Sequence, residues 1–144
     1  MFLCGLSNST VYENVVTYCG VGIRLGGCSN NTIYANKIAN NWGEPGEGAI
    51  SFVGSNNNRV YDNNITANHR AGIFLDYSSD DKFWHNNIID NEDNQVLIWY
   101  QPVICMWDDD YPSGGNYWSD YLGVDFYSGP FQNETGSDGI GDTP

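Results

Sequence analysis

The strongest constraint on the fold is an internal repeat that runs through the first two thirds of the chain. A ten-residue pattern, in which a short apolar run follows asparagine or serine, recurs at 7–16, 29–38, 56–65 and 79–88. The offsets between successive copies are 22, 27 and 23 residues, and the longest one contains an insertion around 44–47. Repeats of this period indicate stacked units that bury their apolar faces against one another.

Each repeat has a second half with its own apolar pattern. Segments 22–25, 49–52, 72–75 and 95–98 match one another, and 1–3 fits the same slot after a 22-residue shift. The chain therefore begins in the middle of a coil. We expect it to be part of a longer solenoid, with an incomplete first coil.

Side chains along a strand point alternately inward and outward, so the repeat predicts four inward columns. They are Val11, Ile33, Val60 and Phe83; Val16, Ile38, Ile65 and Ile88; Ile23, Ile50, Ile73 and Val96; and Leu25, Phe52, Leu75 and Ile98. Asparagines are expected to stack at two corners, where they satisfy turn backbone. These stacks are Asn14, Asn36, Asn63 and Asn86, and Asn41, Asn68 and Asn91, with Cys19 beginning the second.

The pattern predicts an all-β fold, a right-handed parallel β-helix (solenoid) of about four coils over 1–100. An irregular aromatic C-terminal cap is expected over 101–144. Helical and leucine-rich repeats would need longer helical periods, and a propeller blade needs about 40 residues. A left-handed hexapeptide helix would show a six-residue period, which is absent.

The two ends of the predicted solenoid differ. Residues 101–144 are expected to cover the last coil, with the outward side chains of Phe74, Leu97 and Trp99 as an apolar platform. The first coil has no such cover, so its strand edge is open for pairing. Repeated head-to-tail pairing would give a homo-oligomer or a filament.

Charge limits the partners of the chain. It has 18 acidic and 5 basic residues, a net charge of −13, which disfavours nucleic acid and anionic membrane surfaces. No apolar run reaches the roughly 18 residues that a spanning helix needs, so no membrane insertion is expected. Glycosylation sequons begin at Asn8, Asn30, Asn64 and Asn133. They favour an extracellular or cell-surface location.

The repeats resemble those of NosD-like proteins and of the wider group of carbohydrate-binding and sugar-hydrolysing right-handed β-helices. Segments 107–121 and 138–144 resemble the closing segment of archaeal NosD-domain surface proteins. The resemblance implies an exported surface protein, or an accessory protein for copper delivery like bacterial NosD. A shared fold does not fix function, so the sites must be argued from the residues themselves.

One column of aromatic residues is the main candidate binding site. These residues follow the first inward position of each coil, so their rings should point outward and form a flat platform for sugar rings. The candidate glycan-binding residues are Tyr12, Tyr34, Tyr61 and Trp84. The same stacking could instead only stabilise neighbouring strands, or support the folded-back C-terminal segment.

Metal sites are the second group of candidates. A structural calcium ion is expected to bind oxygen ligands in the acidic C-terminal segment. The candidate ligands are Asp108, Asp110, Asp138 and Asp142. Copper is not expected, because neither His69 nor His85 has a partner at ligand spacing and Cys105-Met106 is the only soft pair.

Two further pairs of residues are candidates for catalysis or for a disulfide. Asp62 and His85 should be neighbours on one face, which allows acid–base catalysis or a solvated ion pair. Basic residues that often accompany such a site in β-helix enzymes look scattered; they are Arg24, Lys37, Arg59, Arg70 and Lys82. A Cys4–Cys28 disulfide is geometrically possible, and free thiols are the alternative.

These features rank the possible functions. A non-enzymatic exported surface module that binds glycan or self-assembles comes first. A purely structural filament or cell-envelope subunit comes second, and a polysaccharide lyase or hydrolase third. A NosD-like copper accessory protein is the remaining alternative. The expected partner is a glycan or a cell-envelope polymer.

Overall fold

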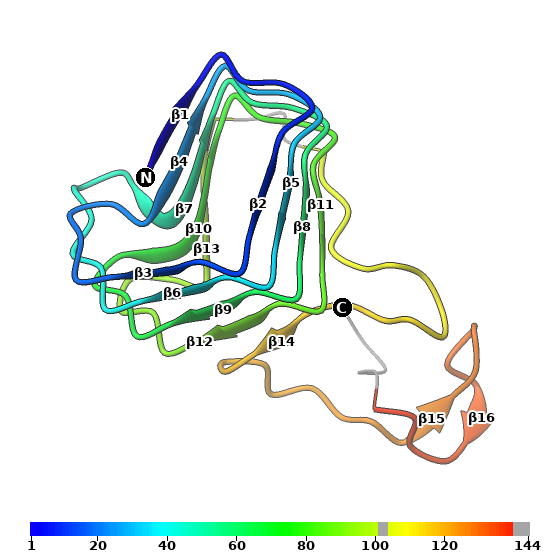
Figure 1. The fold of residues 1–144 in the computed structure, drawn as a ribbon. Coiled ribbons are helices and arrows are strands. Elements are labelled where there is room, and N and C mark those ends of the chain that lie inside the picture. Colours follow the sequence, from blue (N-terminus) through cyan, green and yellow to red (C-terminus); the bar gives the residue numbers. More distant parts are fainter. Residues whose placement is uncertain (101–103, 140–144) are drawn as a thin grey trace.

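The computed structural model describes residues 1–100 and 104–139, whose strands stack into a three-sided parallel solenoid with a small hairpin beside it (Figure 1). The first sheet contains β1 (Phe2–Cys4), β4 (Ile23–Gly26), β7 (Gly48–Val53), β10 (Ala71–Asp76) and β13 (Val96–Tyr100). The second contains β2 (Thr10–Tyr12), β5 (Thr32–Tyr34), β8 (Arg59–Tyr61) and β11 (Lys82–Trp84). The third contains β3 (Val15–Thr17), β6 (Lys37–Ala39), β9 (Asn64–Thr66), β12 (Asn87–Ile89) and β14 (Tyr117–Trp118). The hairpin pairs β15 (Tyr127–Ser128) with β16 (Glu134–Thr135).

Each solenoid strand pairs in parallel with its counterpart one coil later, in the register that the repeat predicts. Ile50 lies between Ile23 and Ile73, across the 27- and 23-residue offsets. Sharp corners join the strands, and residues such as Ala35 and Asp62 adopt left-handed backbone there, both with φ of 54°. The predicted right-handed parallel β-helix is confirmed.

The predicted inward columns fill the solenoid. Phe52 and Phe83 are fully buried and meet edge to face, with ring centroids 5.6 Å apart. Ile98 is the exception: it pairs with Leu75, yet 37% of its surface is exposed. β13 is the last strand of the first sheet, so no described strand lies beyond it to cover this side chain. The predicted register of Ile98 is therefore confirmed, but its side chain lies at the end of the described column and is not part of the buried core.

Both predicted asparagine stacks form buried ladders. The backbone N–H and the side-chain amide of Asn36 both donate to Oδ1 of Asn63, at 3.0 and 2.9 Å. Cys19 begins the second ladder by donating its N–H to Asn41 at 3.0 Å. A third ladder, which the sequence analysis missed, consists of Ser9, Asn31, Asn58 and Asp81. The ladders satisfy corner backbone that water cannot reach.

The C-terminal segment begins as a fifth, partial coil. Met106 pairs in parallel with β11, and the Trp107 ring stacks on Phe83 with centroids 4.5 Å apart. β14 pairs with β12, and Asn116 extends the first asparagine ladder. The expectation of a segment without repeat is corrected: loop 108–115 is inserted between the two halves of this coil and hides its period.

The outer face of the first sheet is covered by the insertion in the longest repeat. The C-terminal segment was expected to cover this face, but its described residues do not. Figure 1 shows this loop projecting from the stack just before β7. Gly46 lies so close to Trp99 that a Cβ there would come within 2.6 Å of the ring. Glu47 is buried and forms an ion pair with Arg24. Phe74 is buried beneath this cover and contacts Trp99 edge to face.

The four cysteines are free thiols, so the possible Cys4–Cys28 disulfide is not formed. Cys28 points into the solenoid and is fully buried, whereas Cys4 is exposed. Burial also raises the pKa of the Cys105 thiol to about 11, which keeps it protonated and unreactive near neutral pH. Among the described residues, no helix has the length and apolar character needed to cross a membrane.

Candidate functional site: the outer face of the second sheet

The outer face of the second sheet brings together side chains that are far apart in the sequence. Its strands are three residues long, with the middle residue buried and the first and third facing outward. The first positions carry Thr10, Thr32, Arg59 and Lys82. The third positions carry Tyr12, Tyr34, Tyr61 and Trp84, here called the ring ladder. Two parallel rows of functional groups therefore cross the coils.

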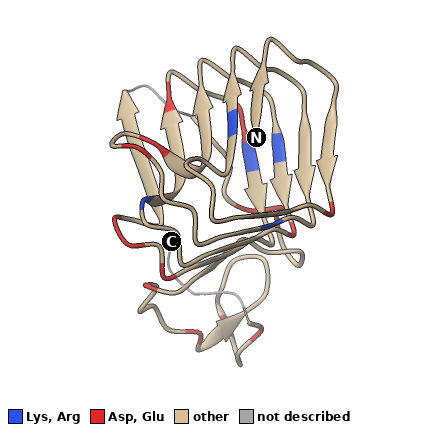
Figure 2. Cartoon of the chain, turned by 60° about the vertical axis from the view of Figure 1, so that its left-hand side comes forward, with Lys and Arg blue, Asp and Glu red and all other residues tan. Residues whose placement is uncertain are grey.

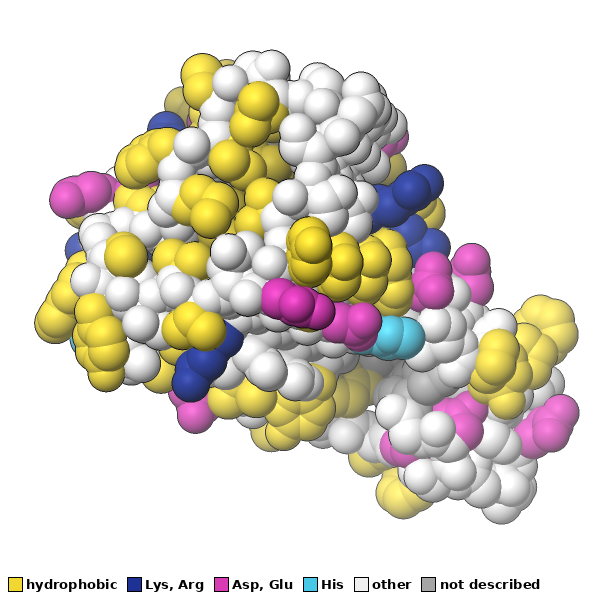
Figure 3. Space-filling view, in the orientation of Figure 1, with side chains coloured by type: hydrophobic (Ala, Val, Ile, Leu, Met, Phe, Trp, Pro, Cys, Tyr) yellow, Lys and Arg dark blue, Asp and Glu magenta, His cyan; other side chains and the backbone are white. Residues whose placement is uncertain are grey.

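The rings of the ring ladder stack on one another along the solenoid. Successive centroids are 5.2, 5.1 and 4.6 Å apart, and the planes are inclined by 5°, 5° and 19°. Figure 3 shows this row of hydrophobic side chains crossing the face. Because each inner ring covers the face of its neighbour, the ladder presents ring edges and tyrosine hydroxyls outward. The predicted glycan contacts stay a prediction, but they would be made through edges and hydroxyl groups.

Packing within the ring ladder also affects ionisation. Desolvation by the adjacent rings raises the pKa of the Tyr34 phenol, and the neighbouring Tyr12, Tyr61 and Glu13 oppose a further negative charge. The Tyr34 hydroxyl therefore remains neutral at physiological pH. In that state it can both donate and accept hydrogen bonds, as sugar hydroxyls require.

Arg59 and Lys82 form a pair of adjacent cations on this face, here called the cation pair. The basic residues look scattered in the sequence, but the 23-residue offset places these two on paired positions of β8 and β11. Figure 2 shows the charged residues along the chain, with most basic residues on strands and acidic residues mainly in the turns. The impression of scattered basic residues is therefore corrected, since the repeat offset itself predicts this pairing.

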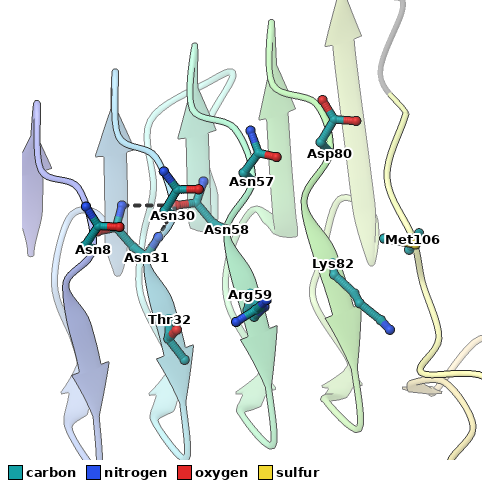
Figure 4. A pocket seen from close by; sticks show the side chains of 10 residues that line it. All are labelled: Asn8, Asn30, Asn31, Thr32, Asn57, Asn58, Arg59, Asp80, Lys82 and Met106. Carbon is teal, nitrogen blue, oxygen red and sulfur yellow. Dashed lines mark hydrogen bonds between the residues drawn. The ribbon is translucent and has the colours of Figure 1, made fainter.

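Two surface hollows meet at the cation pair. One, of about 410 Å³, extends toward the corner that precedes the second sheet (Figure 4). Exposed amides at this corner form the asparagine row, which consists of Asn8, Asn30 and Asn57. The other, of about 440 Å³, extends toward Tyr61 and Trp84. Both hollows are lined by Thr32, Arg59 and Lys82, so the face is continuous from amides to rings.

The C-terminal segment closes one end of this face. Lys82 Nζ donates to Asp109 Oδ1 at 2.8 Å and lies 5.5 Å from the centroid of the Trp84 ring. This hydrogen bond raises the pKa of the Lys82 ammonium and lowers the pKa of the Asp109 carboxyl, so both groups are charged at neutral pH. Among the described residues, no ion pair or hydrogen bond engages the guanidinium of Arg59.

Asp62 and His85 are brought together as expected, with Nδ1 of His85 3.7 Å from Asp62 Oδ1. Nε2 of His85 lies 2.7 Å from the Ser113 carbonyl oxygen and 3.2 Å from Ser113 Oγ. A carbonyl oxygen can only accept, so Nε2 carries a hydrogen and cannot act as a base toward this hydroxyl. The Ser113 hydroxyl donates to Asp109 Oδ2 at 3.0 Å. The cluster therefore anchors loop 108–115, and nothing in the sequence pattern indicated Ser113.

The predicted calcium ligands do not converge among the described residues. Asp108 and Asp110 are exposed in loop 108–115, whereas Asp138 lies beside the hairpin and accepts hydrogen bonds from the backbone of Gly129 and the Gln132 amide. No group of three His, Cys, Asp or Glu side chains in 1–100 and 104–139 is placed to hold a metal ion. The fourth predicted ligand is outside the described residues; it is Asp142. Calcium binding stays a prediction.

Hydrogen bonds organise the loop in which calcium was expected. Asp125 accepts from the Ser137 hydroxyl at 2.7 Å and from the Gly139 N–H at 2.8 Å. The bond from Ser137 is the main reason why the pKa of Asp125 lies below its usual value. This carboxylate, which the sequence analysis did not single out, closes the loop through hydrogen bonds.

The comparisons with known proteins agree with the geometry. Residues 2–103 match the family model described as a right handed beta helix region. No match was found among curated proteins or among solved structures. The family match covers more than half of the chain and the same coils that the strands form. The chain belongs to the right-handed β-helix family.

Proposed function

We propose that this chain is a non-enzymatic, exported glycan-binding module whose second sheet holds an extended sugar chain across the coils. One observation carries the proposal, the continuity of the face from the asparagine row through the cation pair to the ring ladder. Amides, charged groups and aromatic side chains around a shallow hollow supply the hydrogen bonds and apolar contacts that orient a sugar.

The coil spacing makes this face periodic. Paired strands are about 4.8 Å apart, so four rungs span roughly 14 Å along the solenoid. A polymer lying across the strands would meet a strand side chain and a ring edge at each coil, with an amide on the first three coils and Asp80 on the fourth. Its hydroxyl groups would exchange hydrogen bonds with the amides and with the tyrosine hydroxyls. A periodic face of this kind suits a polymer better than a small metabolite.

The other functions receive less support from the same face. The lyase or hydrolase alternative would need a base beside the bound sugar, and His85 lines neither hollow, because its Nε2 donates to the Ser113 carbonyl and its Nδ1 faces Asp62 at 3.7 Å. A copper accessory role would need converging ligands, and the described residues hold no group of three His, Cys, Asp or Glu side chains placed to bind a metal ion. The resemblance of 107–121 to archaeal NosD-domain surface proteins, together with the net charge of −13 and the sequons, supports an exported surface protein.

The proposal is tested by binding measurements on the purified chain with a panel of neutral and acidic oligosaccharides, by calorimetry. We expect at least one member to bind, and the double variant Tyr61→Ala/Trp84→Ala to weaken its binding at least tenfold. Tyr18→Ala is the matched control, because Tyr18 is 74% exposed and lies at a corner after β3, away from the face. Trp84→Tyr should retain binding, since it continues the tyrosine stack.

Circular dichroism and urea unfolding must first show that the double variant is folded. Unchanged binding by a folded double variant would contradict the proposed site. Absence of binding to every member of the panel by the unmodified chain would contradict the proposed function.

Self-association is a second candidate, because both edges of the first sheet are open in the described structure. β1 and β13 are its opposite edges, and each pairs with a single strand. Three residues on β13 are exposed by 37%, 59% and 52%, namely Ile98, Trp99 and Tyr100. All strands of this sheet run in the same direction, so β1 of a second copy could extend β13 in parallel.

Light scattering across a range of protein concentrations tests this second candidate. The mass should rise with concentration, and Ile98→Lys should reduce the rise by placing a charge at the edge. Leu122→Lys is the control, because Leu122 is 94% exposed and lies in the C-terminal segment. A monomer mass at every concentration would contradict self-association.

A further inference from the structure

We propose that the cation pair, Arg59 and Lys82, is a subsite for the carboxylate of an acidic sugar unit. This inference rests on the proposed function and names the class of glycan: an oligosaccharide in which uronate units are separated by neutral units. The subsite lies at the junction of the two hollows, where both cationic side chains reach the surface (Figure 4).

The positive charges of the cation pair on the outer face of the second sheet favour binding of an anion. Arg59 and Lys82 occupy directly paired positions of neighbouring parallel strands, where like charges repel. Asp109 offsets the charge of Lys82. The guanidinium of Arg59 has no ion pair or hydrogen bond among the described residues, although the chain contains 18 acidic residues. An anion at the junction would supply the partner that the protein itself does not provide.

The groups around the cation pair favour a carboxylate that is carried on a sugar. The planar guanidinium of Arg59 matches a carboxylate through two parallel hydrogen bonds. The Thr32 hydroxyl is on the adjacent rung, paired with Arg59. The amides of Asn30 and Asn57 lie on one side and the ring edge of Tyr61 on the other. These neutral groups suit the ring hydroxyls of the same unit.

The charge around the subsite limits how many carboxylates the ligand can carry. Asp80 lines the first hollow and Asp109 the second, so a carboxylate on each neighbouring unit would approach an acidic side chain. The net charge of −13 adds a general repulsion of densely charged polyanions. We therefore expect isolated carboxylates to be preferred over a continuous run of them.

Three probes separate these effects. The first is an alternating oligosaccharide of glucuronate and N-acetylglucosamine. The second is its carboxyl-reduced form, in which each carboxylate becomes a neutral hydroxymethyl group. The third is an oligogalacturonate of equal length, with a carboxylate on every unit. Dissociation constants are measured by calorimetry at low and at moderate salt.

The unmodified chain should bind the alternating oligosaccharide at least tenfold more tightly than either other probe. Arg59→Gln should remove the preference over the reduced form and leave binding of the reduced form within about twofold. Lys37→Gln is the matched control, because Lys37 is exposed on β6 of the third sheet and should leave the preference unchanged. Added salt should reduce the preference.

The outcomes distinguish this inference from the proposed function. Equal or tighter binding of the reduced form by the unmodified chain would overturn the carboxylate subsite and leave glycan binding intact. A preference that persists in Arg59→Gln would overturn the assignment to this residue. Tighter binding of the oligogalacturonate would overturn the preference for isolated carboxylates. If neither these probes nor the wider panel binds, the proposed function fails together with the inference.

Discussion

Two buried ladders run along the corners on either side of the second sheet, and they end in different ways. One lies between the second and third sheets and consists of Asn14, Asn36, Asn63, Asn86 and Asn116. The other lies between the first and second sheets and consists of Ser9, Asn31, Asn58 and Asp81. The ladder between the second and third sheets is amide throughout and is here called the complete ladder. The ladder between the first and second sheets ends in a carboxyl group and is here called the interrupted ladder.

In the complete ladder every inner amide has ladder partners on both sides. Asn86 donates from Nδ2 to the carbonyl oxygens of Val60 and Trp84, at 2.9 and 3.1 Å, and to Asn116 Oδ1 at 2.8 Å. Its own Oδ1 accepts from the backbone and the amide of Asn63. A side chain that both donates and accepts can repeat indefinitely, which explains why asparagine suits this corner.

In the interrupted ladder the last rung, Asp81, can accept but cannot donate hydrogen bonds in its charged form. Asn58 donates its N–H and its Nδ2 to Asp81 Oδ1, at 2.7 and 2.9 Å. Asp81 Oδ2, in the place of an asparagine Nδ2, is buried and has no hydrogen-bond partner among the described residues. Burial raises the pKa of Asp81 to about 7, against the opposing hydrogen bonds from Asn58. Replacing one amide by a carboxyl group thus makes a structural corner sensitive to pH.

The largest expected effect comes from breaking the complete ladder. Asn63→Ala removes five side-chain hydrogen bonds, two accepted from Asn36 and three donated by Nδ2. At about 1 kcal/mol each, the free energy of unfolding should fall by about 5 kcal/mol. Urea unfolding measures the loss, with the exposed neighbour Asn64→Ala as control. A loss below about 1 kcal/mol would show that water replaces the ladder.

The second effect comes from completing the interrupted ladder with Asp81→Asn. The folded-state pKa of about 7 is above the ordinary value of 3.8, so the folded chain binds this proton more tightly than the unfolded chain. The stability contributed by Asp81 is therefore full below about pH 4 and is lost as pH rises toward 7. Asp81→Asn should be more stable than the unmodified chain by about 4 kcal/mol at pH 8.

Urea unfolding between pH 4 and pH 8 checks this dependence, and the gain should shrink toward zero at the acidic end. Asn63→Asp is the matched converse, because it places a carboxyl group in the complete ladder. It should make stability fall with rising pH over the same range. A gain in Asp81→Asn that does not vary with pH would contradict the ionisation argument.

The contrast between the ladders also shows what the sequence could reveal about the fold. Coils of nearly constant length place equivalent residues one above another, so the inward columns and the first four asparagines of the complete ladder followed from the offsets alone. The fifth rung was hidden, because 30 residues separate Asn86 from Asn116 and loop 108–115 lies between them. Nor could the period show that Gly46 would cover Trp99, since loops follow no repeat.

The candidate site was predictable in part for the same reason. Alternation along the strands predicted that the ring ladder faces outward, and the 23-residue offset could have revealed the cation pair. Ring orientation was not visible, because alternation gives the direction of a side chain but not the plane of its ring. The contacts of Asp109 and Ser113 were hidden as well, since both residues lie in the inserted loop.

The smallest effect is expected at the last rung of the complete ladder, with Asn116→Ala. Asn116 accepts from the backbone and amide of Asn86 and donates to the carbonyl oxygens of Phe83 and Trp107. It is only partly buried, so water can replace some of these bonds, and the loss should be about 2 kcal/mol. Hydrogen exchange should quicken in 104–119 and stay slow in β5 and β8, because Asn116 joins this segment to Asn86 and Phe83 of the preceding coil.

The exposed asparagine Asn94 provides the control for this variant, since its side chain lies outside all three ladders, and Asn94→Ala should leave exchange unchanged. If Asn116→Ala instead destabilised the whole chain as strongly as Asn63→Ala, the fifth coil would be part of the cooperative core. A local effect would mean that the ladder weakens toward its C-terminal end, where water reaches the last rung, Asn116. The ladder would then stabilise each coil in proportion to how completely its neighbours exclude water from the corner.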